Sequence, residues 1–243
     1  MNNLSYLIEY YDELYDVSPE QKVFYKELSD KFRMPTRFLG IDCATGYFEH
    51  FLAREGHDVT GLETSHEMLT RANLRRRMPN TALRYFQMST LDMARYLGKG
   101  FYNIVSILNS KLMYITDKTL FRKFFYDCKQ FLSKDGVLIV EIYNFSKLTD
   151  KSSFQLPERQ SIRSKLFSEV INNGDGSWSL KQSIEISSGK ILSLDDDVKI
   201  MPYLPSEIEK AAKEAGFSTV NIYSDFKKNP YSDEKNMVIL EIL

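Results

Sequence analysis

Apolar residues recur along the chain at two spacings, which predict alternating helices and strands. Residues 3–32 carry leucines and aromatic residues three and four positions apart, a pattern that predicts two amphipathic helices separated near Pro19. Five short apolar runs follow, at residues 37–42, 58–63, 82–87, 101–109 and 137–143. Because helical patterns separate these runs, we expect a parallel sheet with right-handed crossovers, the doubly wound α/β architecture.

The pattern changes after Asn144. Three alternating runs, KLFSEVI, SWSLKQSIEI and KILSLDDDVKI, lie within residues 165–200 and are separated by NNGDG and SSGK. Glycine and asparagine at such positions are typical of hairpin turns, so we expect three inserted antiparallel strands that form a lid. A helix over residues 206–216 and two last strands would complete a mostly parallel, seven-stranded sheet.

These elements divide the chain into three parts. Residues 1–36 are expected to form an N-terminal helical cap, and residues 37–144 together with 201–243 a Rossmann-like domain. Residues 145–200 would be the inserted strands, acting as a substrate lid. A chain of 243 residues, 43% of them hydrophobic, can bury the core of one large domain with such an insertion.

Composition narrows the classes of partner. The chain has 32 basic and 33 acidic residues, so neither a nucleic-acid backbone nor an anionic membrane is an expected partner. Its two cysteines and three histidines show no metal-ligand spacing, and we expect no metal site. The first residues lack the apolar stretch of a signal peptide, which predicts a cytoplasmic protein. A small molecule is the expected partner, and a homodimer is left open.

The segments FLGIDCATG and GLE carry the most specific signal. The loop after the first predicted strand ends at Gly46, and the second strand ends at Glu63, 17 residues further along. A loop at a helix amino terminus can pass close under a cofactor, while an acid on the neighbouring strand end can accept both hydroxyl groups of a ribose. This spacing is the one that a known family of cofactor-binding enzymes shows, and the resemblance to that family implies a nucleoside-containing cofactor.

With TSHEML and NIVSILNS, these segments resemble the class I S-adenosylmethionine-dependent methyltransferases. The stretches GLETSHEML and EIYNF are most similar to glycine and amino sugar N-methyltransferases, and the resemblance is weakest in residues 145–200. It implies S-adenosylmethionine as cofactor and S-adenosylhomocysteine as product. The implied activity is methyl transfer by direct displacement to nitrogen or oxygen of a small molecule, with nitrogen favoured.

The resemblance also assigns roles to individual residues. Glu63 would bind the ribose, Met68 would pack near the adenine, and Tyr15 and Tyr143 would hydrogen-bond an acceptor amine as catalytic residues. For Ser89 an adenine contact and a plain helix cap are both open, with Asp92 as the alternative adenine ligand. The cofactor-binding residues that it implies are Tyr11, Asp42, Cys43, Ala44, Gly46, Glu63, Thr64, Met68, Ser89, Thr90, Leu108 and Asn109. Tyr11 and Tyr15 also fit a packing role in the core.

The loop itself departs from the family pattern. Gly40 stands where an acid is expected, and Asp42 and Ala44 stand where two glycines are expected, so only Gly46 remains. Ala44 costs little if its φ stays negative, whereas Asp42 adds a side chain and a charge where the chain turns tightly. Aspartate tolerates a left-handed backbone better than most residues. Asp42 is also a candidate substitute for the acid that recognises the methionine amino group.

Two other classes of function stay open at this stage. A non-catalytic member of the fold would bind the cofactor weakly and act as a sensor or partner subunit, and the altered loop motivates this alternative. A dinucleotide oxidoreductase would share the loop and the strand-end acid. The chain contains no GxGxxG motif, which argues against the oxidoreductase.

Overall fold

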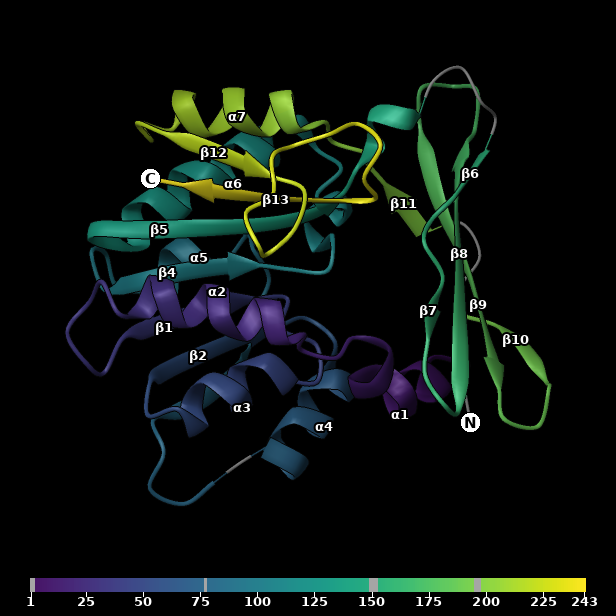
Figure 1. The fold of residues 1–243 in the computed structure, drawn as a ribbon, viewed down its shortest axis with the longest axis horizontal. Coiled ribbons are helices and arrows are strands. Elements are labelled where there is room, and N and C mark those ends of the chain that lie inside the picture. The colour runs from purple at the N-terminus through teal and green to yellow at the C-terminus, as the bar shows by residue number, and fades with distance from the viewer. Residues whose placement is uncertain (1–2, 77, 149–152, 195–197) are drawn as a thin grey trace.

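A seven-stranded sheet organises most of the chain in the computed structural model, which describes residues 3–76, 78–148, 153–194 and 198–243. The strand order is β12-β13-β5-β4-β1-β2-β3 (Figure 1). The strands are β1 (Arg37–Ile41), β2 (Asp58–Glu63), β3 (Leu83–Gln87), β4 (Tyr102–Ile107), β5 (Leu132–Tyr143), β12 (Val220–Tyr223) and β13 (Met237–Ile242). The predicted domains also include residues 1–2, 77, 149–152 and 195–197, which lie outside the described residues.

Strand direction gives the sheet its class. Strands β1 to β5 pair in parallel, whereas β13 runs antiparallel to both β5 and β12. A second, antiparallel sheet is inserted between β5 and the last two strands of the first sheet. The predicted α/β fold, a mostly parallel seven-stranded sheet with inserted antiparallel strands, is therefore confirmed.

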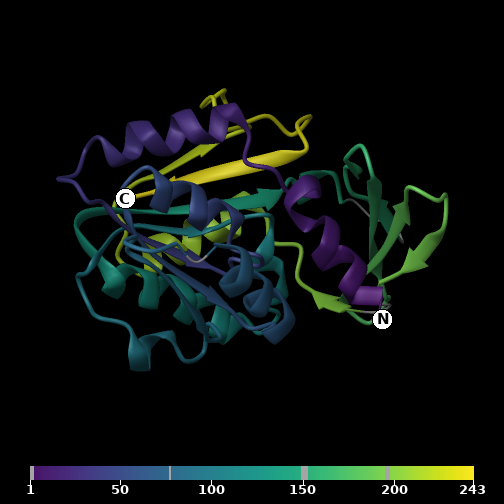
Figure 2. The same ribbon diagram turned by 90° about the horizontal axis from the view of Figure 1, so that it is seen from below.

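Helices cover both faces of the main sheet, as Figure 2 shows. Helices α2 (Pro19–Ser29) and α3 (Tyr47–Arg54) pack on one face, and α5 (Met93–Tyr96), α6 (Lys118–Phe131) and α7 (Pro205–Glu214) pack on the other. Helix α4 (His66–Arg76) lies beside β2 and β3. Successive strand residues point to opposite faces: Phe38 packs with α2 and α3, and Leu39 with α6 and α7. Among the described residues, no helix is long and apolar enough to cross a membrane.

The segment from Lys134 to Gly136 lies inside β5 and interrupts its pairing. Pairing with β4 jumps from Tyr102 opposite Leu132 to Ile104 opposite Val137, so the extra residues bulge out of the ladder. Asp135 takes a left-handed conformation there, with φ of 62°. Strand pairing continues on both sides of this bulge.

The second sheet contains six strands, so the prediction of three was wrong. They are β6 (Ser153–Gln155), β7 (Arg159–Gln160), β8 (Ser164–Asn172), β9 (Trp178–Ile186), β10 (Ile191–Ser193) and β11 (Val198–Ile200). The polar segment before β8 supplies β6 and β7, which both pair with β8. The run KILSLDDDVKI divides into β10 and β11, which both pair with β9. Strands of two or three residues are too short to show a period of two.

Helix α1 (Asn3–Leu14) lies between the two sheets (Figures 1 and 2). Its buried side chains Leu7, Ile8, Tyr10, Tyr11 and Leu14 form one apolar cluster with residues of both neighbours. The main domain contributes Ala44 and Met68, and the second sheet contributes Leu166, Ile184, Leu192 and Leu194. Two short 3₁₀ helices, η1 (Lys111–Tyr114) and η2 (Phe145–Lys147), complete the carboxyl edge of the main sheet.

A pair of neighbouring aromatic residues on α6 tests the core of the main sheet. Phe125 is 0% exposed and Tyr126 is 57% exposed. We expect Phe125→Ala to lower the free energy of unfolding by about 3–5 kcal/mol, because it leaves a cavity between α6 and the sheet. Tyr126→Ala is the matched control and should cost less than about 1 kcal/mol. Urea unfolding followed by circular dichroism measures both; similar losses for the two variants would contradict the packing described.

Candidate functional site

The loop after β1 takes a left-handed backbone at three alternate residues. The φ angles are 53° at Asp42, 51° at Ala44 and 67° at Gly46. Ala44 therefore does not meet the condition of a negative φ under which it would cost little. Left-handed geometry costs a residue with a Cβ atom roughly 1 kcal/mol or more, and aspartate less than most. The loop thus keeps a path suited to glycine although two of the three glycines are absent.

Hydrogen bonds to the end of β2 hold this strained path in place. The backbone N–H of Cys43 donates to the Leu62 carbonyl at 2.8 Å, and that of Ala44 donates to Oε2 of Glu63 at 2.8 Å. Oε1 of Glu63 accepts from the backbone N–H of Ser65 at 2.7 Å. The Glu63 side chain is 5% exposed, and its carboxylate therefore ties the β1 loop to the β2 loop.

A narrow cavity of about 30 Å³ lies where this loop meets α1 and the end of β4. Its lining residues are Tyr11, Tyr15, Ile41, Asp42, Cys43, Tyr47, Phe48, Glu49, Ser106, Leu108 and Asn109. The residues come from α1, the β1 loop, α3 and β4, so the cavity opens at the carboxyl edge of the parallel strands. Ligands of open α/β sheets bind at this edge.

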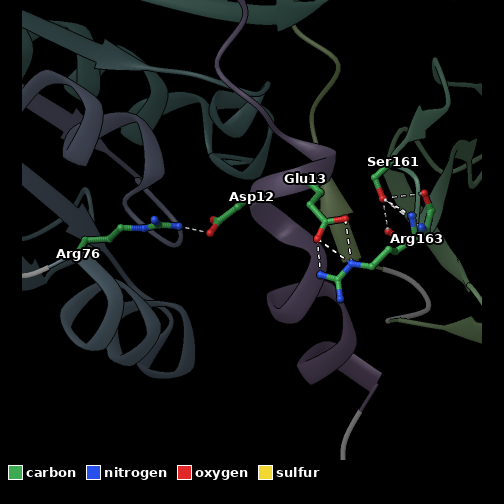
Figure 3. A network of polar contacts seen from close by, with 6 residues as sticks. Asp12, Glu13, Arg76, Ser161 and Arg163 are labelled. Carbon is green, nitrogen blue, oxygen red and sulfur yellow. Dashed lines mark hydrogen bonds and ion pairs between the residues drawn. The ribbon is translucent and has the colours of Figure 1, made fainter. Parts of the chain in front are cut away.

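Helix α1 closes the cavity and is anchored to both sides by neighbouring acids, as Figure 3 shows. Asp12 forms an ion pair with Arg76 of α4 and accepts a 2.5 Å hydrogen bond from the Thr45 hydroxyl. Glu13 forms an ion pair with Arg163, in the turn before β8. Because residues 12 and 13 point about 100° apart around a helix, the two anchors face different sheets.

Two cations approach the tyrosines on the other side of α1. The Arg159 guanidinium lies 4.2 Å from the centre of the Tyr15 ring, and its Nε donates to the Tyr143 hydroxyl at 3.4 Å. The Lys111 ammonium lies 5.9 Å from the centre of the Tyr11 ring. Neither Arg159 nor Lys111 forms an ion pair with a carboxylate of the described residues. Glu63 and Asp42 lie within electrostatic range of Lys111, and Glu141 lies within range of Arg159, so the positive charge of this part of the site is only partly compensated.

Burial raises the pKa of two acidic side chains around the cavity. Desolvation, with a smaller contribution from the negative charge of Glu63, raises the pKa of Asp42 from 3.8 to about 6. Desolvation also raises the pKa of Glu49 from 4.5 to about 8. A positive charge placed beside either carboxyl group would lower its pKa again and favour the ionised form.

The structure brings several of the predicted site residues together. Tyr11, Tyr15, Asp42, Cys43, Leu108 and Asn109 line the narrow cavity. Glu63 contacts Ala44, and the Thr64 hydroxyl donates to Glu63 at 3.3 Å. Ala44 and Met68 pack against α1, and Gly46 accepts a hydrogen bond from Tyr85 at 2.9 Å through its carbonyl.

The others lie apart from the cavity. Ser89 and Thr90 follow β3 outside the cavity lining, and the Ser89 hydroxyl donates to the Asp92 carboxylate at 2.7 Å. Tyr143 contacts Arg159 and packs with Phe145 and Leu156, on the side of the second sheet. Tyr143 and Tyr15 are nevertheless connected, because Arg159 touches both.

Three charged residues of this region were not predicted from the sequence: Glu49, Lys111 and Arg159. A signal existed for Glu49, since a charged residue stands with Leu52 and Ala53 on the buried face of α3. Lys111 follows the NIVSILNS stretch by one residue. Arg159 had no usable signal, because β7 is two residues long and lies in a polar segment.

Comparisons with known proteins identify the main domain. Residues 38–136 match the family model of a methyltransferase domain. A protein of Geobacillus sp. (strain WCH70) that is named as a methyltransferase is 27% identical over 143 residues. The match spans 57% of this chain and 57% of the relative. The glycine/sarcosine N-methyltransferase of Halorhodospira halochloris is 24% identical over 230 residues, 90% of this chain and 80% of the relative.

Solved structures share the whole fold. An S-adenosylmethionine-dependent methyltransferase from Clostridium acetobutylicum superposes with a TM-score of 0.78 at 17% identity, over 99% of this chain and 98% of that one. A sugar N-methyltransferase from Streptoalloteichus sp. gives a TM-score of 0.65 at 16% identity, over 97% and 91% of the two chains. At these identities the likeness establishes the fold alone.

The raised pKa of Asp42 predicts a pH-dependent stability. In the folded chain this carboxyl keeps its proton up to about pH 6, whereas in the unfolded chain it loses the proton near 3.8. Burying the charge therefore destabilises the folded chain increasingly as pH rises between these values. We expect the stability of Asp42→Asn relative to wild type to increase by roughly 1–3 kcal/mol from pH 4 to pH 7.

Asp135→Asn is the control for this experiment. Asp135 has a similar left-handed φ of 62° but an exposed side chain. Urea unfolding across the same pH range should show no comparable trend for this variant. A constant difference between Asp42→Asn and wild type would contradict the electrostatic account of Asp42.

Proposed function

Because residues 38–136 form a class I methyltransferase domain, we propose that this enzyme transfers the methyl group of S-adenosylmethionine to the nitrogen of a small molecule. The observation that carries the proposal is the loop from Asp42 to Gly46, which keeps a left-handed path and donates its Ala44 N–H to Glu63. This geometry places an acid of β2 beside a loop that a nucleoside can approach closely.

The chemistry of the site fits the cofactor. A carboxylate has about four acceptor positions, so Glu63 can accept the ribose hydroxyls while its two backbone hydrogen bonds remain. Met68 is buried beside α1, where it would contact the adenine. Asp42 and Glu49 supply carboxyl groups for the positive charge of the cofactor. The tyrosines Tyr11 and Tyr15 would cover its methionine part.

Cofactor binding requires α1 to move. Pockets for ligands of this size are typically several hundred Å³, whereas the cavity under α1 is about 30 Å³. The arrangement described here is thus a closed one, with α1 seated on Ala44 and Met68. Release of the contacts of Asp12 with Arg76 and Thr45 would open the cofactor side of the helix.

The proposed reaction is a direct displacement. Bound S-adenosylmethionine supplies a methyl group on a positively charged sulfur. The lone pair of the acceptor nitrogen bonds to the methyl carbon as the carbon–sulfur bond breaks, and the bonding electrons stay on sulfur. The methylated nitrogen then releases a proton to water. Tyr15 and Tyr143 would orient the amine, and alignment would supply most of the rate.

Positive charge beside the tyrosines constrains the acceptor. Arg159 and Lys111 disfavour a protonated amine, so the acceptor enters with its lone pair free. The same cations favour an anionic group on the acceptor. Of the acceptor classes named by the relatives, glycine and sarcosine carry a carboxylate and a plain sugar amine does not. We therefore propose an amine that bears a carboxylate, with the second sheet selecting it.

Cofactor binding is the first test. We expect S-adenosylhomocysteine to bind the wild-type chain in isothermal titration calorimetry, and Glu63→Gln to weaken it by roughly 10-fold or more, because charged acceptors form the stronger hydrogen bonds. Glu55→Gln, at an exposed position at the end of α3, should bind as the wild type does. Absence of binding at millimolar ligand would overturn the enzyme proposal and favour a non-catalytic role.

Acceptor selection is the second test. With S-adenosylmethionine present, we expect glycine or sarcosine to be methylated faster than glucosamine. Arg159→Gln should raise the KM for the carboxylate-bearing amine roughly 10-fold or more and change kcat less, because the lost contact serves binding. Lys190→Gln, which removes an exposed cation next to β10, is the matched control. Equal methylation of glucosamine, or an unchanged KM, would contradict the proposed acceptor.

A further inference from the structure

The motif at the end of β1 lacks an acid, and a carboxyl group from another element lies where that acid would be. Gly40 occupies the position where the family resemblance places an acid. The structure leaves no room for such a side chain: a Cβ atom on residue 40 would clash with Oε1 of Glu49 and lie 2.9 Å from its Cδ. The carboxyl group of Glu49 therefore fills the volume that the missing acid would have occupied.

Glu49 reaches this place from the first turn of α3. Its neighbours on the helix, Leu52 and Ala53, pack into the core, and Glu49 shares their buried face with 4% of its surface exposed. A carboxyl group on such a face is costly unless something compensates its charge. Its presence there calls for a positively charged partner.

That partner is not supplied by the chain. The Glu49 carboxylate accepts a hydrogen bond from its own backbone N–H, and no cationic side chain of the described residues forms an ion pair with it. Glu49 lines the narrow cavity together with Asp42, Ser106 and Asn109. The unpaired carboxyl group thus faces the space that the proposed cofactor would enter.

We propose that Glu49 has taken over the role of the acid missing at residue 40 and binds the positively charged amino group of the cofactor. The inference rests on the proposed function, because it concerns the same cofactor. Asp42 is the competing acid, but it sits in the strained loop and its carboxyl group does not fill the space above Gly40. The raised pKa of Glu49 agrees with a buried group that awaits a cation.

Two ligands separate this role from a structural one. S-adenosylhomocysteine carries the amino group, whereas 5′-methylthioadenosine lacks the whole amino acid part but keeps the nucleoside and sulfur. In calorimetry we expect Glu49→Gln to weaken S-adenosylhomocysteine binding roughly 10- to 100-fold. Binding of 5′-methylthioadenosine should change less than about 3-fold. Glu55→Gln, at the exposed residue that follows the last turn of the same helix, should change neither.

A double substitution that returns the acid to residue 40 provides a further test. Glu49→Ala should weaken S-adenosylhomocysteine as Glu49→Gln does, and it opens the space above Gly40. The double variant Gly40→Asp/Glu49→Ala should recover roughly 10-fold of that loss, whereas Gly40→Asp alone should destabilise the fold through the clash with Glu49.

The outcomes are distinct. If the wild-type chain binds neither ligand, the proposed function fails and this inference fails with it. If the wild type binds S-adenosylhomocysteine but Glu49→Gln binds it equally well, only the inference is overturned. An equal loss for both ligands would assign Glu49 a structural role, and a selective loss in Asp42→Asn instead would assign the amino group to Asp42.

Discussion

The apolar contacts of α1 with two separate sheets are the constraint on which the rest of the site depends. One helix of 12 residues buries side chains against Ala44 and Met68 on one side and against Leu166 and Ile184 on the other. Apart from α1, the second sheet meets the main domain at the end of β5, in the cluster around Tyr143, and where β11 contacts η1. The burial of α1 therefore sets how far apart the loop from Asp42 to Gly46 and Arg159 lie.

Below α1, the loop from Asp42 to Gly46 shows how a fold preserves a backbone path after its favoured residues are gone. Two residues with Cβ atoms adopt φ values above 50°, which costs free energy at each. Hydrogen bonds to Leu62 and Glu63 offset that cost, and charge-assisted bonds of this kind are among the stronger ones in proteins. Glu63 is thus as much a structural residue of the loop as a candidate ligand.

The sequence predicts the parts of this protein that depend on local patterns. The continuous apolar runs of β1, β4 and β5 follow from burial on both faces of the sheet. The interval from Gly46 to Glu63 follows from the geometry of one β-α-β unit. The family resemblance and the enzyme class, which rest on these segments, are confirmed. The residue roles within the site stay predictions.

What the sequence did not predict depends on contacts between distant segments. Strands β6 and β7 form by pairing with β8. Segments of two or three residues show no periodicity from which they could be predicted. Arg159 reaches Tyr15 only because α1 and the second sheet meet. Gly40 and Glu49 lie nine residues apart along the chain. Only the structure shows that the Glu49 carboxyl group occupies the space beside Gly40.

The two anchors of α1 differ in their contact with water. The side chains of Asp12 and Arg76 are 19% and 14% exposed, whereas those of Glu13 and Arg163 are 34% and 51% exposed. Dissolved ions screen exposed pairs much more than partly buried ones. Rising ionic strength therefore loosens α1 from the second sheet before it loosens α1 from the main domain. The different burial of Asp12 and Glu13 thus sets the order in which α1 separates from the second sheet and from the main domain.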